Sequence, residues 1–578
     1  MRIIGLPSVR PTHATVRSFA HARLVLALAL ALPLAACGPA GPSLPGAPEA
    51  VAVRPLDEAV AVSWVLGSDG GSALLNHAFS LDDGDNWTAF DPPVTSGGAV
   101  IGELVNGALH RLRVRAVNAR GPGAASGAVE AVAARPSYLV GAHAPGHLQV
   151  NGIASLRDGG VFVVGYHYGQ ASFGAIPPVE SSWSERGFIA TLDAGAAWRW
   201  IVDLEAGGAS SIEAVAPLAD GAVVVGTFGQ TLDLHPFGSF TSSGGSSFVA
   251  TLDRDGTWLW AEVMDAEAGS SVAGLAVAVA PDGDVVVAGT VYGTVRFGDT
   301  VVSSATTFDA FVARLAPGGG WRWVAVAGAD AVTVPTTLAF TPDGGAVIGG
   351  RTRATQPVAT LPATGNAGND DGFVAALGAD GASWRWVRTL GGSSNDRVEG
   401  VAVADGTLVA IGSYFGTAAF GPLGTRPPPF AAMTTAYLLR LSFDGAWESV
   451  AIVAASGGAA FRRAVARPGG GIVIAAEANG DVLFPGGVSG GVGSGPYLLD
   501  FDASEALLGV ARLGRGGGVT TETGSAHVYA LALGVGGVPV VGGTLYGAVN
   551  DGTTVIEQAD GAFGPDLFVW KAAFEVLD

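Results

Sequence analysis

Few residues of this chain have the types and spacing that catalysis or metal binding needs. The sequence contains one cysteine, Cys37, so it offers no internal disulfide, cysteine metal cluster or thiol catalysis. Gly487-Val488-Ser489-Gly490-Gly491 matches the letters Gly-x-Ser-x-Gly. It lies in a glycine-rich loop without a strand-to-helix elbow, so we assign it no nucleophile. His143 and His147 are four residues apart in a Gly/Pro segment, not on a helix, and we expect no zinc site there.

Carboxylates are the other candidates for chemistry. They are Asp82, Asp83 and Asp85 in one turn, Asp253 and Asp255 in Asp253-Arg254-Asp255-Gly256, and Asp309, Asp371 and Asp566, each two residues before a repeated aromatic residue. No dense Asp-x-Asp-x-Asp loop is present, so we expect solvated turn acids or acceptors for backbone amides and no calcium site. Paired glycosidase carboxylates are not recognisable without geometry. The sequence therefore assigns no catalytic, cofactor-binding or metal-binding residue.

Composition excludes one class of partner. The 578 residues carry a formal net charge of −20, and only 14% are charged. An acidic surface repels phosphate backbones, so we expect no nucleic-acid binding. Glycine reaches 89 residues and lies between Val, Phe and Trp runs, which is typical of many short strands joined by tight turns. The predicted fold class is all-β.

The N-terminal segment has the pattern of an export signal. Arginines without acids precede an apolar run from Leu24 to Leu34. The run is about half of the ~20 apolar residues that span a bilayer, so residues 1–36 are expected to be a signal peptide and not a membrane helix. The run ends in Leu34-Ala35-Ala36-Cys37-Gly38.

These last residues resemble the lipobox of bacterial lipoproteins. The resemblance implies lipidation at Cys37, which would become the mature N-terminus and the membrane anchor. Gly38 in place of Asp after the cysteine favours the outer membrane if the source is Gram-negative. Residues 37–46 form a Gly/Pro tether. The alternative is an ordinary signal peptide with an incidental cysteine.

Residues 47–136 show the period of β-strands. Residues for the two faces of a strand alternate in runs such as Ala59-Val60-Ala61-Val62-Ser63-Trp64, and Asp/Gly and Asn-Gly turns separate these runs. About seven short strands around one buried Trp predict a β-sandwich. Gly46-Ala47-Pro48, Val62-Ser63-Trp64 and the run from Val114 to Gly121 resemble a fibronectin type III domain. The corner tyrosine of that family would fall at His110, whose imidazole could still bond the backbone. Such domains are most often spacers.

From residue 137 to residue 578 the chain repeats itself. An aromatic residue opens a Phe-Val-Ala-x-Leu-type run at Phe188, Phe248, Phe311, Phe373, Tyr437, Tyr497 and Phe568. A Gly-rich marker with an aromatic residue precedes most copies, as in Gly289-Thr290-Val291-Tyr292-Gly293. The copies at Gly349-Gly350-Arg351-Thr352 and before Asn479-Gly480 are degenerate. A Trp-x-Trp pair follows in the first four copies, for example Trp321 and Trp323.

Each repeat is predicted to contain four strands. Seven four-stranded units of about 60–70 residues favour a seven-bladed β-propeller. The last copy lacks a Trp-x-Trp strand, while an orphan run, Tyr138-Leu139-Val140, precedes the first. Fourteen residues separate Tyr138 from Gly152, and also Trp200 from Ala214. We therefore expect the N-terminal run to complete the last blade and close the ring.

The repeated tryptophans could form a carbohydrate platform, but recurrence at one position favours packing between blades. The run Leu390-Gly391-Gly392-Ser393-Ser394-Asn395-Asp396 and the run from Asp309 to Leu315 resemble bacterial SBBP-type β-propeller repeats. That resemblance implies a fold and an extracytoplasmic setting, and it brings no catalytic residues.

The sequence predicts a monomeric cell-envelope lipoprotein that acts as a non-catalytic binding or display module. Its expected partners are a membrane, through Cys37, and an extracellular protein or polysaccharide; no cofactor is expected. The alternatives are an extracellular lyase or hydrolase with its site in the propeller channel, and a purely structural envelope protein. Acids with His or Arg from different blades in one pocket would favour the enzyme. Specific contacts are expected where the copies differ, in the loops of the fourth to sixth units.

Overall fold

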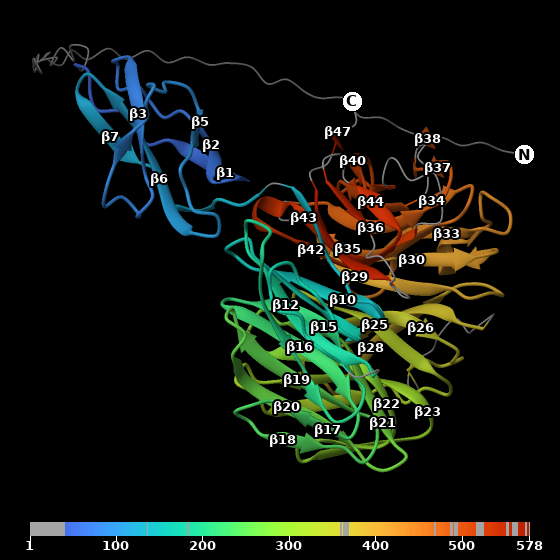
Figure 1. Ribbon diagram of the computed structural model, residues 1–578. Helices are drawn as coiled ribbons and strands as arrows, with labels where there is room; N and C mark the ends of the chain where they lie inside the picture. Colours follow the sequence, from blue (N-terminus) through green and yellow to red (C-terminus); the bar gives the residue numbers. More distant parts are fainter. Residues whose placement is uncertain are drawn as a thin grey trace, which may run out of the picture.

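A computed structural model of the chain describes residues 41–135, 137–181, 184–358, 361, 369–467, 470–485, 489–490, 495–515, 525–550, 554–557, 565–572 and 575–576 (Figure 1). The signal segment and Cys37 lie outside these residues, as does most of the Gly-x-Ser-x-Gly loop. Within the described part, no helix has the length and apolar character needed to cross a membrane.

The all-β prediction is confirmed, because the described chain consists of antiparallel strands with two short 3-10 turns, η1 (Gly421–Leu423) and η3 (Val535–Gly537). The N-terminal strands are β1 (Glu49–Leu56), β2 (Ala59–Val65), β3 (Leu74–Ser80), β4 (Thr88–Ala89), β5 (Gly98–Ile101), β6 (Leu109–Asn118), β7 (Gly121–Ala125) and β8 (Val129–Val132). One sheet has the order β1-β2-β5 and the other β4-β3-β6-β7, with β8 also on β6.

The predicted core tryptophan of this part is buried. Trp64 packs with Phe90, Val62 and Val114 between the two sheets. At the position of the corner tyrosine, Nε2 of His110 is buried without a hydrogen-bond partner among the described residues, so this ring nitrogen does not make the expected backbone bond. The sequence signal for the core was strong since alternation decides which side chains face inward.

Seven units of four antiparallel strands follow in the described part of the chain. The first three units are β10 (His147–Ser155), β11 (Val161–Tyr168), β12 (Arg186–Leu192) and β13 (Trp198–Asp203); β15 (Ser210–Leu218), β16 (Gly221–Phe228), β19 (Ser246–Asp253) and β20 (Trp258–Ala266); and β21 (Ser271–Val279), β22 (Val285–Phe297), β23 (Thr300–Leu315) and β24 (Trp321–Val326). The next two are β25 (Thr333–Phe340), β26 (Ala346–Thr352), β27 (Asp371–Leu377) and β28 (Trp384–Leu390); and β29 (Arg397–Ala404), β30 (Thr407–Phe415), β33 (Thr434–Leu441) and β34 (Trp447–Ala455). The last two are β35 (Ala459–Ala466), β36 (Ile472–Ala478), β39 (Gly495–Phe501) and β40 (Leu507–Arg512); and β42 (Ser525–Leu533), β43 (Pro539–Tyr546), β46 (Asp566–Lys571) and β9 (Tyr138–Ala142).

Additional short strands lie outside the four-stranded units. They are β14 (Glu205–Ala206), β17 (Thr231–Asp233), β18 (Ser239–Thr241), β31 (Ala418–Ala419), β32 (Thr425–Arg426), β37 (Val482–Leu483), β38 (Ser489–Gly490), β41 (Gly514–Arg515), β44 (Ala548–Asn550), β45 (Val555–Glu557) and β47 (Glu575–Val576). The second and third units are hydrogen-bonded into one sheet because the end of β20 pairs with the end of β22.

The last unit takes its fourth strand from the opposite end of the repeats. β9 pairs antiparallel with β46, with Tyr138 opposite Lys571 and Gly141 opposite Phe568. The 14-residue spacing therefore predicted this pairing correctly. β42 and β43 of this unit lie beside β10 of the first unit (Figure 1).

Neighbouring units share their hydrophobic cores. Side chains of a given strand alternate between two clusters: Ile472 and Ile474 of β36 face the fifth unit, while Val473 and Ala475 face the seventh. One cluster joins the last unit to the first, since Val540 and Val569 pack with Leu148. Burial on both faces explains the near-continuous apolar runs of the second and third strands.

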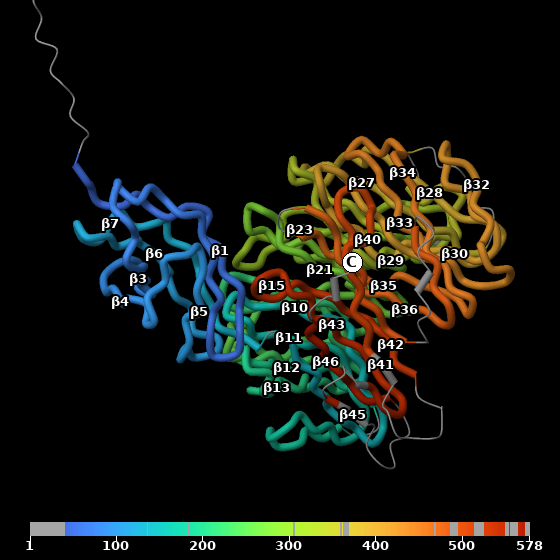
Figure 2. Tube along the Cα trace, turned by 90° about the horizontal axis from the view of Figure 1, so that it is seen from above, coloured from blue at the N-terminus to red at the C-terminus, as the bar shows by residue number. Residues whose placement is uncertain are grey.

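The first strand of every unit lies against the first strands of its two neighbours, and β10 contacts both β15 and β42. Viewed from above, β10, β15, β21, β29 and β35 lie towards the middle of the repeat region, and β13 and β34 lie farther out (Figure 2). The first strands therefore line its interior.

Each of these first strands is interrupted by a β-bulge at the same place. The residue at the bulge differs from unit to unit: Asn151, Glu213, Leu275, Thr336, Glu399, Arg462 and Tyr529. Bulge side chains bond the next first strand at the same level, as Asn151 Nδ2 does to the Ile212 carbonyl at 2.9 Å and Thr336 Oγ1 to the Val398 carbonyl at 3.1 Å. A bulge redirects a side chain out of the pleat, so these positions vary without disturbing the core.

The Trp-x-Trp strands pack as predicted. The second Trp donates its indole N–H to a turn of the following unit, from Trp200 to the Arg254 carbonyl at 3.0 Å and from Trp260 to the Pro317 carbonyl at 2.8 Å. The Gly residue of that turn has a positive φ and lies over the ring, as at Gly256 (φ +88°). The next unit covers these rings, so they do not form an exposed surface on which a sugar could stack.

Candidate ligand-binding pocket

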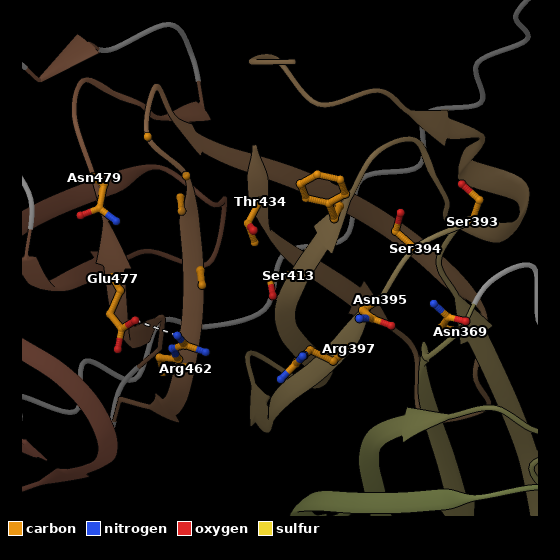
Figure 3. A pocket seen from close by; sticks show the side chains of 15 residues that line it. Asn369, Ser393, Ser394, Asn395, Arg397, Ser413, Thr434, Arg462, Glu477 and Asn479 are labelled. Atoms are coloured by element: carbon orange, nitrogen blue, oxygen red, sulfur yellow. Dashed lines mark hydrogen bonds and ion pairs between the residues drawn. The ribbon is translucent and has the colours of Figure 1, made fainter. Parts of the chain in front are cut away.

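A cavity of about 660 Å³ opens between the fifth and sixth units. It lies where β30 and β36 end and where β29 and β35 begin, so its walls come from different repeats (Figure 3). The lining residues are Asn369, Ser393, Ser394, Asn395, Arg397, Ser413, Phe415, Thr434, Gly457, Gly458, Ala459, Ala460, Arg462, Glu477 and Asn479. We refer to this cavity as the Ala460 pocket.

The pocket owes its space to small residues in the sixth unit. Ala460 stands two residues before the bulge of its strand, directly opposite Glu477. The same position holds Arg397 in the fifth unit, His527 in the seventh and Gln149 in the first. The sixth unit thus has a methyl group where the units on either side have a long side chain, as the third unit also has at Ala273, and the neighbouring Gly457 and Gly458 add no side chain to the lining.

The lining is mostly polar. Amide groups come from Asn369, Asn395 and Asn479, and hydroxyls come from three serines and Thr434. Phe415, 41% exposed, is the one aromatic residue on the wall. Lipophilic ligands favour apolar pockets with few polar groups; a wall of amides, hydroxyls and one ring matches a ligand that itself carries many hydroxyl groups.

Two charged residues of the lining, Arg462 and Glu477, contact charged residues of the two neighbouring units. Arg462 forms an ion pair with Glu477 at 2.7 Å and lies 3.8 Å from Glu399 of the fifth unit. The dashed contact in Figure 3 marks the Arg462–Glu477 pair. His527 of the seventh unit lies 3.4 Å from Glu477, whose Oε1 also accepts the Val528 N–H at 2.9 Å.

The electrostatics keep Glu477 ionised. Burial alone would raise the pKa of this carboxyl, but the contact with His527 and the charge of Arg462 hold the pKa below its ordinary value. The same carboxylate raises the pKa of His527. Burial lowers the pKa of the neighbouring Arg463 guanidinium, whose Nη1 donates to the Glu399 carbonyl at 3.3 Å. Glu477 is therefore a hydrogen-bond acceptor that is already held by three groups.

Arg397 is the cation with spare hydrogen-bonding capacity. Its side chain is 43% exposed and lies 3.6 Å from Glu399, its one polar side-chain contact among the described residues. A guanidinium has five N–H donors. Several of them are therefore free to bond a ligand in the pocket.

The loop that carries the pocket's serines is fixed by a buried acid. Asp396 is fully buried and accepts hydrogen bonds from the N–H groups of Gly392 at 2.6 Å and Phe415 at 2.9 Å. Burial raises the pKa of Asp396 despite these bonds. This loop belongs to the stretch that resembles the SBBP repeat, and its acid has a structural role here.

The structure separates the residues that the sequence singled out. His143 bonds Asp566, whereas His147 stacks on Tyr166 with ring centroids 5.5 Å apart, so the two histidines do not form a pair. Asp309 and Asp566 accept backbone N–H groups, from Ala329 and Ala144, as predicted.

Asp82 and Asp253 bond groups of their own turns, whereas Asp83 pairs with arginines of β6. Asp82 accepts the Ser80 hydroxyl at 2.6 Å, Asp83 pairs with Arg111 and Arg113, and Asp253 accepts two amides of its turn. In the part of the chain that the structure describes, no three His, Cys, Asp or Glu side chains are grouped to hold a metal ion.

The sequence did not identify Arg397, Arg462, Glu477 or His527 as a group. A signal was present, because Glu477 and Asn479 stand where other copies of the Gly-rich marker have a small hydroxyl residue and an aromatic residue. The pocket lies in the fifth and sixth units, within the region where the degenerate copies predicted specific contacts.

Comparisons with known proteins give little further guidance. No protein-family model matches the chain. The regulatory protein FlaEY of Caulobacter vibrioides is 31% identical over 220 residues, which cover 36% of this chain and 22% of that protein. The chain thus spans about a fifth of the length of this relative.

Two solved structures give partial matches. The chicken CNTN1 FN1-FN3 domains match 49% of this chain and 98% of their own, and the titin kinase with its flanking domains matches 26% of this chain and 30% of its own. Both have 14% sequence identity and a TM-score of 0.15. Scores this low carry no argument about the fold.

Proposed function

We propose that residues 137–578 form a closed seven-bladed β-propeller and that residues 47–136 form a fibronectin type III-like spacer. Support for closure comes from the β9–β46 pairing, from the contact of β10 with both β15 and β42, and from the shared core of the last and first units. Support for the spacer comes from the two sheets around Trp64.

The proposed activity is non-catalytic binding of a polysaccharide in the Ala460 pocket. One observation carries it: a cavity of about 660 Å³ whose wall combines amides, hydroxyls, an arginine with free donors and an exposed ring. Sugars offer hydroxyl groups in every direction, so convergent donors and acceptors recognise them. The pre-formed, fully bonded frame behind the wall limits the ordering cost of binding.

We further propose that the protein is anchored in a bacterial envelope through a lipid on Cys37, with both β-domains outside the cytoplasm. The support is the run Leu34-Ala35-Ala36-Cys37 after an apolar segment. Metabolic labelling with an alkyne fatty acid should mark the protein in cells and not its Cys37→Ser variant. Equal labelling of both would contradict this part of the proposal.

An enzyme in the same pocket is the second candidate. Arg462 and Glu477 of the lining contact Glu399 and His527 of the two neighbouring units, and such a convergence of charged groups is expected of a lyase or hydrolase. Binding is favoured because Glu477 is ionised and held by Arg462, His527 and a backbone N–H. Such a carboxylate is a weak proton donor at neutral pH.

A glycan array and calorimetry on the fragment 47–578 would test the proposal. Neutral polysaccharides should bind, and Ala460→Gln, which copies the first unit's Gln149 into the cavity, should abolish binding. Leu259→Gln, at an exposed residue of the outer strand β20, is the control and should bind normally. New reducing ends or unsaturated products that disappear in His527→Ala would establish the enzyme instead. No binding by any polysaccharide would refute the binding proposal, and the absence of products as well would refute the enzyme.

A further inference from the structure

Aromatic side chains recur at one position of the Gly-rich marker, just before its closing glycine. They are Tyr168, Tyr292, Phe415 and Tyr546, in the first, third, fifth and seventh units. The next residue is in each case a glycine with a positive φ between +70° and +83°, so the strand turns immediately after the ring. Phe415 is already part of the Ala460 pocket.

The four rings lie at the same end of the repeats as the pocket. Tyr168 stands opposite His147, Tyr292 opposite Ser271, and Tyr546 opposite Ser525. Each partner is the fourth residue before the bulge of its strand. A bulge side chain bonds the carbonyl just before the bulge of the next first strand, as Asn151 and Thr336 do, so the first strands of neighbouring units are aligned. Residues at equal distances from the bulge therefore lie on the same face of the repeat region.

Three of these four aromatic residues are exposed although the repeat buries most of its apolar side chains, and Tyr168 is half-buried. Tyr292 is 36%, Phe415 41% and Tyr546 40% exposed. Phe308 of β23, also exposed, lies beside Tyr292 with ring centroids 5.3 Å apart. Exposed aromatic groups that cluster on one face of a soluble protein are typical of an interaction surface.

We propose that this face binds an extended neutral polysaccharide chain, with the Ala460 pocket holding one segment and the rings of the other odd-numbered units stacking against further sugar residues. The inference rests on the proposed function and extends its site from the pocket to the rings of the first, third and seventh units. Stacking buries the apolar face of a sugar on an aromatic ring while the hydroxyls at its edge remain hydrated.

Charge argues for a neutral chain. The net charge of −20 repels a polyanion over the whole surface. Two of the even-numbered units have a polar side chain at the corresponding marker position, Arg353 in the fourth unit and Asn479 in the sixth, while the second unit has Gly229 there. Alternating rings and hydrogen-bonding groups match a polymer in which each sugar offers both an apolar face and hydroxyls.

Chain length supplies the test. Binding is measured by calorimetry with a soluble β-glucan, a xylan and a galactomannan, and with the trisaccharide of each. The double variant Tyr292→Ser/Phe308→Ser changes rings in the third unit, away from the pocket lining. We expect it to weaken polymer binding about tenfold or more, because linked contacts act through effective concentration, and to leave trisaccharide binding unchanged.

Phe237→Ser is the matched control. Phe237 is 42% exposed but lies in the turn between β17 and β18 and is not one of the marker rings, so polymer binding should persist. Equal polymer affinity in the wild type and the double variant would overturn the extended surface while the pocket proposal stands. Loss of trisaccharide and polymer binding together in the double variant, with retained folding, would also overturn it. Absence of binding by either ligand to the wild type would refute the proposed function itself.

Discussion

The Asp566 carboxylate accepts a hydrogen bond from the backbone N–H of Ala144 at 3.0 Å, although 422 residues separate them in the chain. The third unit contains the same bond between Asp309 and Ala329, also at 3.0 Å. Both acids stand two residues before the aromatic of their third strand, and both amides follow the fourth strand at the same offset. The N-terminal run thus reproduces the local contacts of an ordinary repeat.

The first prediction concerns this contact. Asp566→Ala should lower the free energy of unfolding by about 1–3 kcal/mol, because it leaves the buried Ala144 N–H without an acceptor. Urea unfolding followed by tryptophan fluorescence measures the change. Asp309→Ala is the matched variant and should cost a similar amount. An unchanged midpoint in Asp566→Ala would show that the junction of the two chain ends does not contribute to stability.

Repetition explains why the sequence predicted so much of the fold. The seven Phe-Val-Ala-x-Leu runs gave the number of units, and the spacing from Tyr138 to Gly152 identified the strand that pairs with β46. A periodic signal is averaged over many copies, so local ambiguities cancel. The core position of Trp64 followed in the same way from alternation along one strand.

The pocket could not be predicted in this way, because it depends on a contrast between units. Ala460 is unremarkable in the sequence, and it creates space because Arg397 and His527 occupy the same position on either side. The bulge that aligns these residues leaves no mark in the hydrophobic pattern. Ion pairs between units, such as Arg462 with Glu399, also depend on a neighbour about 60 residues away.

A second prediction follows from the His143–Asp566 contact. Nδ1 of His143 lies 2.8 Å from the Asp566 carboxylate, which raises the pKa of the imidazole above its ordinary value of 6.5, against the opposing effect of partial burial. The stabilisation is therefore fully present below about pH 6.5 and is lost as pH rises through the folded-state pKa. The side chain is 39% exposed, so solvent screening limits the effect to less than about 1 kcal/mol.

Urea unfolding of the wild type and His143→Asn between about pH 5 and pH 8 checks this sign. The difference between the two proteins should shrink as pH rises. His527, whose pKa Glu477 also raises, contributes equally to both proteins and cancels. A difference that grows with pH would contradict the assignment of a protonated imidazole to the pair.

The third prediction concerns packing between units. Gly381 has φ +70°, and a Cβ there would lie 2.2 Å from Cδ2 of Trp323 in the preceding unit. Gly381→Ala should therefore add a steric cost of about 1–3 kcal/mol to the ~1–2 kcal/mol of left-handed strain. Gly406 is the control, because its φ is +77° and a Cβ would meet nothing within 4 Å. Equal losses in Gly381→Ala and Gly406→Ala would show that the ring can move aside.

The fourth prediction concerns Lys571, the one lysine of the sequence. It lies on β46 opposite Tyr138 and is 1% exposed, and its Nζ lies 5.8 Å from the centre of the Tyr138 ring. Burial lowers its pKa from 10.5 to about 8. The folded state then binds fewer protons than the unfolded state between these values, so the penalty is full below about pH 8 and vanishes as pH rises above about 10.5.

Lys571→Met should therefore stabilise the protein at neutral pH, by up to about 3 kcal/mol for a shift of this size, and the gain should fall as pH rises from about 8 to about 10. Thermal or urea unfolding across this range measures it. Lys571→Arg is the contrasting variant, since a guanidinium keeps its charge and should destabilise at every pH in the range. A stability gain in Lys571→Met that does not depend on pH would mean that the amine has the same pKa in the folded and unfolded protein. The lysine would then stay charged and hydrated, and packing alone would account for the gain.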